Sequence, residues 1–206
     1  MDTNTLHELA RALLAGELQA EAFLQKLAPS GIGDTGDAQV DLDRSRRCGF
    51  PEVVFGQGKS IEAIERIFHK LLECGTDVFA TRISEQQAKH LTTAFPQGQY
   101  NRVARTFRVP MDGVARIGGR VTLVTAGTSD LPVAEEARET LLWTGADVRM
   151  VQDVGVAGPH RLRAHLAELA GADAVVVVAG MEGALPSVVG GYVDCPVVAV
   201  PTSVGY

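Results

Sequence analysis

One short apolar run constrains the fold of this chain more than any other stretch: residues 174–179 have the sequence AVVVVA. Valine is β-branched and favours strands. The run shows no alternation of polar and apolar residues, so both faces of the strand are expected to be buried, as in the middle of a parallel sheet covered by helices. It is far shorter than the roughly 20 residues that cross a bilayer. The run therefore predicts a parallel α/β sheet.

The second half of the chain alternates strand-like and helix-like segments around this run. Further strands are expected at residues 120–126, 147–152 and 195–201. The expected helices are one capped by Ser129 or Asp130, with Pro132 in its first turn and Gly145 just past its end, one over residues 159–171 and a short one over 184–192. Strand–helix repeats of this length predict an α/β fold with a three-layer, open, doubly wound parallel sheet.

The first half predicts a smaller α/β domain. Its expected elements are strands at 53–55, 77–80 and about 102–109, and helices at about 60–73 and from 85, where Ser84 and Gln87 form a capping box. Leucines at helical spacing predict one or two short helices before residue 27, followed by a turn-rich linker at 29–39. We therefore expect three parts: residues 1–40, the N-terminal α/β domain at 41–116, and the larger domain at 117–206.

The glycine-rich segment GFPEVVFGQGKS at residues 49–60 resembles a phosphate-binding loop only in part. The nucleotide-triphosphate loop requires glycine five residues before the Gly-Lys-Ser end, and Val53 stands there. An ATP-binding loop is therefore rejected. Two interpretations stay open: Lys59 and the following helix N-terminus bind a single anion, or Ser60 simply caps a helix after two turn glycines.

Ligands of doubly wound sheets bind beyond the carboxyl ends of the strands. The loops expected there span residues 127–130, 153–161, 180–186 and 201–206. Their candidate binding residues are Gly127, Thr128, Ser129, Asp130, His160, Arg161, Gly180, Met181, Glu182, Thr202 and Ser203. Backbone N–H groups and hydroxyls before a helix suit a phosphate. Alternatively, Ser129 and Asp130 only cap the helix, and His160 and Glu182 are ordinary surface side chains.

Composition narrows the class of protein. The chain has 206 residues, 46% hydrophobic and 21% charged, as in an ordinary globular protein. The net charge of −6 argues against nucleic acid or a membrane surface as a partner. Three cysteines far apart suit a reducing compartment, and the amphipathic N-terminus differs from a signal peptide, so we expect a cytoplasmic protein. His160 and His165 do not share a helix face, so no metal site is expected.

The loops resemble a known superfamily. The segments VTAGTSDLPVAEEA, VAGPHRL, VVAGMEGALPSVV and PVVAVPTSVGY are similar to the aminoimidazole ribonucleotide carboxylase/mutase (PurE-like) superfamily, and residues 41–59 are similar to the signature of a sister family, LarB, the nickel-pincer cofactor biosynthesis carboxylase/hydrolase. The chain departs from the purine enzymes at residues 156–159, and at Gly183 and Ala184, where their second histidine stands. The resemblance implies a flavodoxin-like, PurE-like sheet.

The resemblance also implies a reaction. The LarB family adds CO2 to pyridinium C5 of nicotinic acid adenine dinucleotide and hydrolyses its phosphoanhydride, which gives pyridinium-3,5-biscarboxylic acid mononucleotide and AMP. CO2 or bicarbonate is then a co-substrate, no cofactor is tightly bound, and Mg²⁺ is a candidate ion for the hydrolysis. The superfamily further implies a homo-oligomer, from dimer to octamer.

Roles for individual residues follow only from this resemblance. Residues 128–130 would bind ribose and phosphate, Arg161 a carboxylate, and His160 would face the same pocket. Glu182 would accept the C5 proton. Arg44, Arg47 and Lys59 would neutralise a pyrophosphate or carboxylates; for the two arginines, surface ion pairs with Asp41, Asp43 or Glu52 are the alternative.

The family's nucleophilic cysteine lies in an N-S-C-A-type segment that follows P-T-S-V-G-Y, and this chain ends at Tyr206. We therefore expect the nucleophile beyond Tyr206, with residues 117–206 incomplete at their C-terminal end. Two other functions stay open: aminoimidazole ribonucleotide carboxylation in purine synthesis, which does not need the 41–59 signature, and a non-catalytic nucleotide-binding module.

Overall fold

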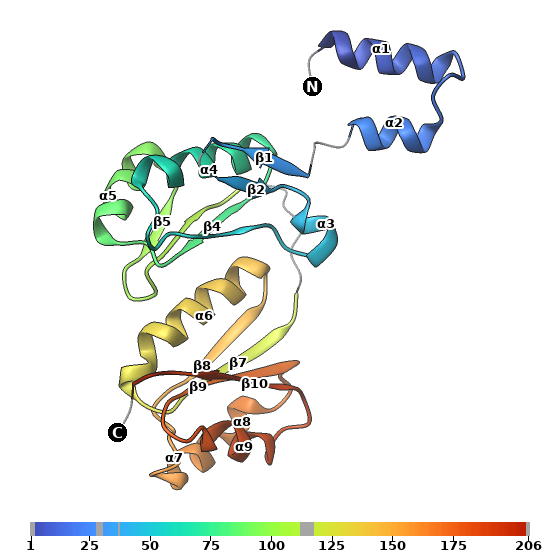
Figure 1. Cartoon of the computed structure of the whole chain (residues 1–206). Helices are drawn as coiled ribbons and strands as arrows, with labels where there is room; N and C mark the ends of the chain where they lie inside the picture. Colours follow the sequence, from blue (N-terminus) through green and yellow to red (C-terminus); the bar gives the residue numbers. More distant parts are fainter. Residues whose placement is uncertain (1–2, 28–30, 37, 112–117, 205–206) are drawn as a thin grey trace.

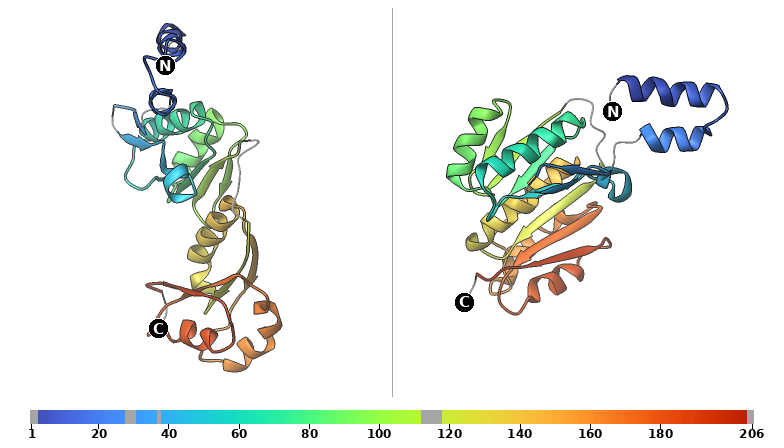
Figure 2. Two further views of the ribbon diagram at one scale, coloured as in Figure 1. Left: turned by 90° about the vertical axis from the view of Figure 1, so that its right-hand side faces the viewer. Right: turned by 45° about the horizontal axis from the view of Figure 1, so that its top comes forward.

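The computed structural model describes residues 3–27, 31–36, 38–111 and 118–204. Two helices at the start, α1 (Thr3–Leu14) and α2 (Ala20–Leu27), pack against each other. They lie apart from the other elements in Figure 1 and in the right-hand view of Figure 2. The rest of the chain forms two α/β domains, one above the other in Figure 1. The boundary expected at residues 116 and 117 touches residues outside the described part of the chain.

The N-terminal domain is a mixed four-stranded sheet packed against two helices. Its strand order is β3-β4-β6-β5, with β3 and β4 parallel and the other pairs antiparallel. The elements are β3 (Val53–Phe55), α4 (Ile61–Glu73), β4 (Val78–Thr81), α5 (Glu85–Ala94), β5 (Gln99–Asn101) and β6 (Thr106–Val109). The two helices begin as expected: Ser60 Oγ accepts from the N–H of Ala63, and Ser84 and Gln87 form the capping box.

Large side chains fill the core of this domain. Helix α4 buries Ile64, Ile67, Phe68 and Leu71, which follow the helical i, i+3, i+4, i+7 pattern. The rings of Phe95 and Phe107 lie 5.4 and 6.0 Å from that of Phe68. This core is therefore largely aromatic at its centre.

Three short elements differ from the sequence-based expectation. The strand expected near 102–109 is wrong in its first half, because residues 102–105 form the turn of a β5–β6 hairpin in which Arg105 has a φ of +55°. The stretch expected to be a linker, residues 29–39, contains β1 (Ile32–Asp34), which forms a hairpin with β2 (Gln39–Asp41); Val40 of β2 joins the core. Residues Arg44–Cys48 form a short helix, α3, that ends at Gly49 with a φ of +82°.

The C-terminal domain has the predicted architecture: a four-stranded, wholly parallel sheet in the order β10-β9-β7-β8. Helix α6 covers one face and helices α7, α8 and α9 the other (Figure 1). The elements are β7 (Arg120–Thr125), η1 (Thr128–Asp130), α6 (Leu131–Thr144), β8 (Asp147–Val151), α7 (Pro159–Ala164), α8 (Leu166–Leu169), β9 (Ala174–Ala179), α9 (Ala184–Gly190) and β10 (Val197–Pro201).

One long helix of the prediction is broken. The helix expected over residues 159–171 divides at His165 into α7 and α8. The N–H of His165 donates to the carbonyl of Leu162, which closes α7 with a tight turn. Its ring nitrogen Nδ1 lies 2.6 Å from Glu168 Oε1. By contrast, α6 ends at Gly145 with a φ of +97°, as its sequence predicts.

Helix α6 also joins the two domains. Its residue Trp143 stacks on Phe79 of β4, with ring centroids 5.1 Å apart and planes 18° apart. Arg82 Nε lies 3.0 Å from Glu136.

Within the described residues, no helix combines the length and apolar character needed to cross a bilayer.

Candidate functional site

A cavity of about 380 Å³ lies at the carboxyl edge of the parallel sheet. This volume falls within the range of small-molecule sites, about 300–1,000 Å³. The loops after β7, β8 and β9 line it, together with Val204, which follows β10. The lining residues are Ala126, Gly127, Ser129, Asp130, Asp153, Gly155, Val156, Ala157, Arg161, Ala179, Gly180, Met181, Glu182, Ala184, Leu185 and Val204.

Asp130 ties two of these loops together. It precedes α6, as expected of a cap, but its side chain makes no bond to the first turn of that helix. Instead Oδ2 accepts from the N–H of Gly127 at 2.9 Å, and Oδ1 accepts from Thr202 Oγ1 at 2.7 Å. The carboxylate is 4% exposed. Asp130 therefore connects the loop after β7 to the loop after β10.

The turn after β9 has a strained backbone that brings it close to the chain end. A Cβ atom on Gly180 would lie 1.9 Å from the carbonyl oxygen of Val204, so only glycine fits. Met181 has a φ of +52° and Gly183 a φ of +68°. Left-handed conformations of a residue such as methionine are rare and concentrate at functional sites. Glu182, between them, is exposed at the cavity wall.

The loop after β8 carries an ion pair into the cavity. Arg161 Nη1 lies 2.8 Å from Asp153 Oδ1. The N–H of Asp153 donates to Oγ1 of the buried Thr125 at 3.2 Å, and that of Gly155 to the carbonyl of Ala126 at 2.9 Å. The loop is therefore fixed to the end of β7.

Comparison with known proteins identifies the family of this chain. Residues 32–111 match the family model of the LarB/PurE-like N-terminal domain, and residues 120–206 match that of AIR carboxylase. The chain is also 41% identical, over 177 residues, to an uncharacterized protein of Methanocaldococcus jannaschii; this covers 82% of the chain and 69% of that relative. The chain belongs to the LarB-like branch of the AIR carboxylase superfamily.

Membership in this superfamily makes the protein one of a carboxylase-type family.

The cavity brings together seven of the residues selected from sequence: Gly127, Ser129, Asp130, Arg161, Gly180, Met181 and Glu182. Thr202 reaches the cavity wall through its bond to Asp130. Thr128, His160 and Ser203 are exposed on the same loops but do not line the cavity. Sequence reasoning missed Asp153.

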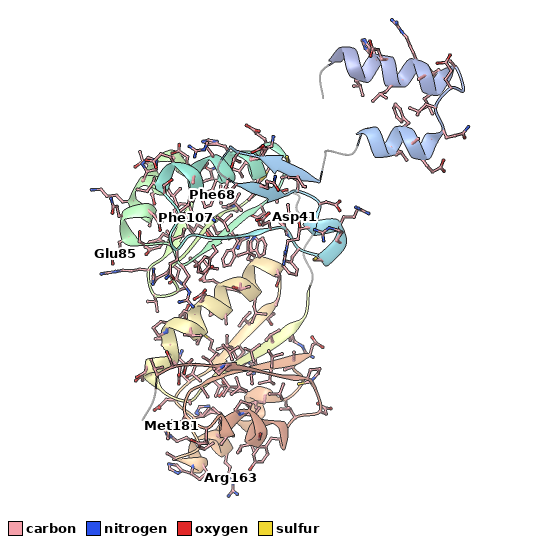
Figure 3. All side chains as sticks on the ribbon, viewed as in Figure 1. Asp41, Phe68, Glu85, Phe107, Arg163 and Met181 are labelled. Atoms are coloured by element: carbon pink, nitrogen blue, oxygen red, sulfur yellow. The ribbon has the colours of Figure 1, made fainter. Side chains whose placement is uncertain are left out.

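The cations of the LarB-like signature lie elsewhere. Arg47 is paired with Asp41, and its Nε is 3.3 Å from Asp43. The hydrogen bond from Arg46 holds the pKa of Asp43 below its usual value. Figure 3 shows Asp41 in the upper domain and Met181 at the far end of the lower one. Arg47 therefore does not reach this cavity in its own chain.

Arg44 and Lys59 also have local surroundings. The Arg44 guanidinium lies 5.0 Å from the centre of the Phe50 ring, and its buried Nε makes no hydrogen bond. Lys59 is exposed, and its backbone carbonyl accepts from Gln87 Nε2 at 3.0 Å. Neither lines the cavity.

The described residues contain no group of three His, Cys, Asp or Glu side chains that could hold a metal ion. Cys48 and Cys74 are exposed on the N-terminal domain, and Cys195 packs against the core of the C-terminal domain. None of these three thiols lines the cavity. The cavity as described thus offers a guanidinium, carboxylates, hydroxyls and backbone N–H groups.

Proposed function

We propose that this protein carries out the LarB-type reaction: carboxylation of nicotinic acid adenine dinucleotide at pyridinium C5 with CO2 or bicarbonate, and hydrolysis of the phosphoanhydride to release AMP. The observation that carries the proposal is the cavity that unites Arg161, Glu182 and the 127–130 loop, in a chain whose N-terminal part matches the LarB-like domain. An anionic aromatic nucleotide needs these groups: a cation for its carboxylate, N–H donors for its phosphate and a base beside its ring.

The chemistry requires a nucleophile first, because a pyridinium ring is electron-poor and does not attack CO2. A thiolate adds to the ring and converts C5 into an enamine-like carbon. C5 then forms the bond to CO2, the C5 proton passes to a base, and the electron pair of that C–H bond restores the aromatic ring as the thiolate leaves. As the resemblance implies, we assign the thiolate to a segment that follows Tyr206.

Glu182 is our candidate for the base. It lines the cavity beside Met181, whose left-handed backbone directs the turn. Glu182 is exposed, so this role requires that the bound ring shields it from water. Arg161 would hold the carboxylate already present on the ring.

The described cavity leaves no carboxylate for Mg²⁺ once Glu182 acts as the base. Mg²⁺ is usually held by one or two carboxylates together with substrate phosphates. Of the cavity's carboxylates, Asp130 accepts two internal hydrogen bonds and Asp153 is paired with Arg161. Glu182 is left, and it is already our candidate base, so we derive no step through a metal ion.

Carboxylation of aminoimidazole ribonucleotide is the second candidate function, since the AIR carboxylase model matches residues 120–206. One observation disfavours it. Gly183 and Ala184 stand where the purine enzymes have their second histidine, so that imidazole is missing from this turn. A non-catalytic nucleotide-binding module is the third candidate.

The deciding experiment is a mass-spectrometric turnover assay on the full-length gene product. Nicotinic acid adenine dinucleotide with labelled bicarbonate should give labelled dicarboxylated mononucleotide and AMP. Label only in the product of a parallel reaction with aminoimidazole ribonucleotide would reject the proposal in favour of purine synthesis. Binding of nucleotide without any turnover would favour the non-catalytic module.

The same assay tests the base. Glu182→Gln keeps the size of the side chain and removes its ability to accept a proton, so carboxylation should fall by about 10²–10⁴-fold. Ser187→Ala, on the exposed side of α9, is the matched control and should retain full turnover. Unchanged turnover of Glu182→Gln would exclude Glu182 as the base.

A further inference from the structure

The guanidinium of Arg161 is confined from two sides. Asp153 Oδ1 contacts its Nη1 at 2.8 Å. On another side it fills the space next to Gly158, where an added Cβ would lie 2.7 Å from Nε. The Arg161 side chain nevertheless remains 36% exposed and lines the cavity. Arg161 is therefore held in place while it stays open to a ligand.

The backbone of Asp153 is fixed by its conformation and by hydrogen bonds. Its φ of +58° lies in the left-handed region, which aspartate tolerates better than most residues. Its N–H is bonded to buried Thr125, and the next residue, Val154, donates its N–H to the Thr125 carbonyl at 3.0 Å. Two hydrogen bonds to one strand end thus set the direction in which the Asp153 carboxylate points.

The ion pair is half exposed, with 36% of the Arg161 side chain and 55% of the Asp153 side chain accessible. Exposed pairs of this kind contribute little to folding stability. What distinguishes the Asp153–Arg161 pair from other surface ion pairs is therefore its position at the cavity wall. A guanidinium has five N–H donors in a rigid fork, so an arginine that gives one to Asp153 still presents donors to a carboxylate of a ligand.

We propose that Asp153 is a positioning residue that orients Arg161 toward the ring carboxylate of the substrate, and that the pair thereby makes this site select a nicotinate nucleotide over its carboxamide counterpart. The proposal rests on the proposed function. A guanidinium forms charge-assisted, bidentate hydrogen bonds with a carboxylate, whereas a neutral carboxamide offers it only one acceptor oxygen and no negative charge.

The experiment measures dissociation constants of nicotinic acid adenine dinucleotide and of its carboxamide counterpart, nicotinamide adenine dinucleotide, by calorimetry on the full-length protein without bicarbonate. Wild type should bind the carboxylate ligand more tightly. Asp153→Gly removes the side chain without opposing the left-handed backbone and should reduce the preference about tenfold, or about 1.4 kcal/mol. Asp153→Asn retains an acceptor for Arg161 and should keep the preference within about threefold of wild type.

Two further variants separate positioning from a general effect on the loop. In an Arg161→Ala background, Asp153→Gly should change the preference no further, since its effect passes through Arg161. Arg163→Ala, on the exposed side of the same helix, should leave the preference unchanged.

The outcomes separate a failure of the role proposed for Asp153 from a failure of the proposed function. If Asp153→Gly weakens both ligands equally, Asp153 is only structural and this inference is overturned while the proposed function stands. If wild type binds neither ligand, or does not prefer the carboxylate, the proposed function is overturned and this inference with it. A lost preference in Asp153→Gly that Asp153→Asn restores supports both.

Discussion

The two four-stranded sheets of the described residues differ in strand direction. In the C-terminal sheet all strands are parallel, so the loops after β7, β8, β9 and β10 leave at one edge and enclose the cavity. In the N-terminal sheet the hairpin of β5 and β6 turns back at the corresponding edge. There the N–H of Ile83 donates to the carbonyl of Arg105, and Gln87 Nε2 to that of Gly56. Parallel topology opens an edge for ligands, whereas the mixed sheet closes it with its own hydrogen bonds.

The hydrophobic cores of the two domains differ in the size of their side chains. The N-terminal core centres on Phe68, Phe95 and Phe107, whereas that around β9 consists mostly of valine, leucine and alanine. Large rings support stability, while small β-branched residues let strand ends and loops approach closely. We therefore expect substitutions in the N-terminal domain to change stability and those at the parallel edge to change binding and turnover.

The largest expected effect tests the stability half of this comparison. Phe107 is fully buried against Phe68, so Phe107→Ala should lower the free energy of unfolding by about 3–5 kcal/mol, the usual cost of a large cavity. Urea unfolding measures the change. Val103→Ala, at a residue 48% exposed on the neighbouring turn, should stay within about 0.5 kcal/mol. A loss below about 1 kcal/mol for Phe107→Ala would contradict the assignment of this core.

The next effect tests the functional half. Gly180→Ala would place a Cβ 1.9 Å from the Val204 carbonyl, so the turn that carries Glu182 must move. A displacement of about 1 Å near reacting groups costs about a hundredfold in rate, which the labelled-bicarbonate assay would detect. Gly190→Ala is the matched control, because an added Cβ there meets no atom within 4 Å. Equal turnover of the two variants would show that the parallel edge tolerates backbone shifts.

Sequence patterns predicted the regular elements well where packing and local signals agree. The valine run of β9, the capping box of α5 and the glycine end of α6 were all confirmed. Strand β5 was missed because Gln99, Tyr100 and Asn101 carry no apolar alternation and are a strand only through pairing with β6. The β1–β2 hairpin was missed for the same reason: Gly33 and Val40 are its buried residues, Val40 alone of the two belongs to the hydrophobic core, and tertiary contact with that core decides the structure of the hairpin.

The candidate site could be predicted to the level of its loops. Parallel strands carry their carboxyl ends to one edge, so residues 127–130, Arg161 and 180–182 were expected to converge, and the cavity contains most of them. Side-chain roles were less predictable. Asp130 accepts a hydrogen bond from Thr202, and the N–H of Asp153 donates to Thr125; these partners lie far apart in the chain, and no local pattern links them.

A smaller effect measures how independent the two halves are. Phe79 and Trp143 stack across the contact between the domains. A double-mutant cycle with Phe79→Leu and Trp143→Leu should give a coupling of about 0.5–1.5 kcal/mol, as aromatic pairs usually do. Unfolding by urea supplies the four free energies. A coupling near zero would mean that the domains touch without stabilising each other, and the comparison would then describe two separate units.

The smallest expected effect is a pH dependence confined to the N-terminal domain. A hydrogen bond with His90, 2.7 Å away, holds the pKa of Glu65 below its usual value. Because the folded-state pKa is lowered, this contribution to stability is present above about pH 4.3, the ordinary pKa of a glutamate, and is lost as the pH falls through the lowered value. The pair is exposed to solvent, so the contribution should be only a few tenths of a kcal/mol. Glu65→Gln should therefore be slightly less stable than wild type at pH 6 and equal to it near pH 3, as thermal unfolding at the two pH values would show. If the stability difference between wild type and Glu65→Gln instead grew as the pH falls, the predicted direction would be wrong, and the acid-sensitive group would have to be sought elsewhere in the molecule.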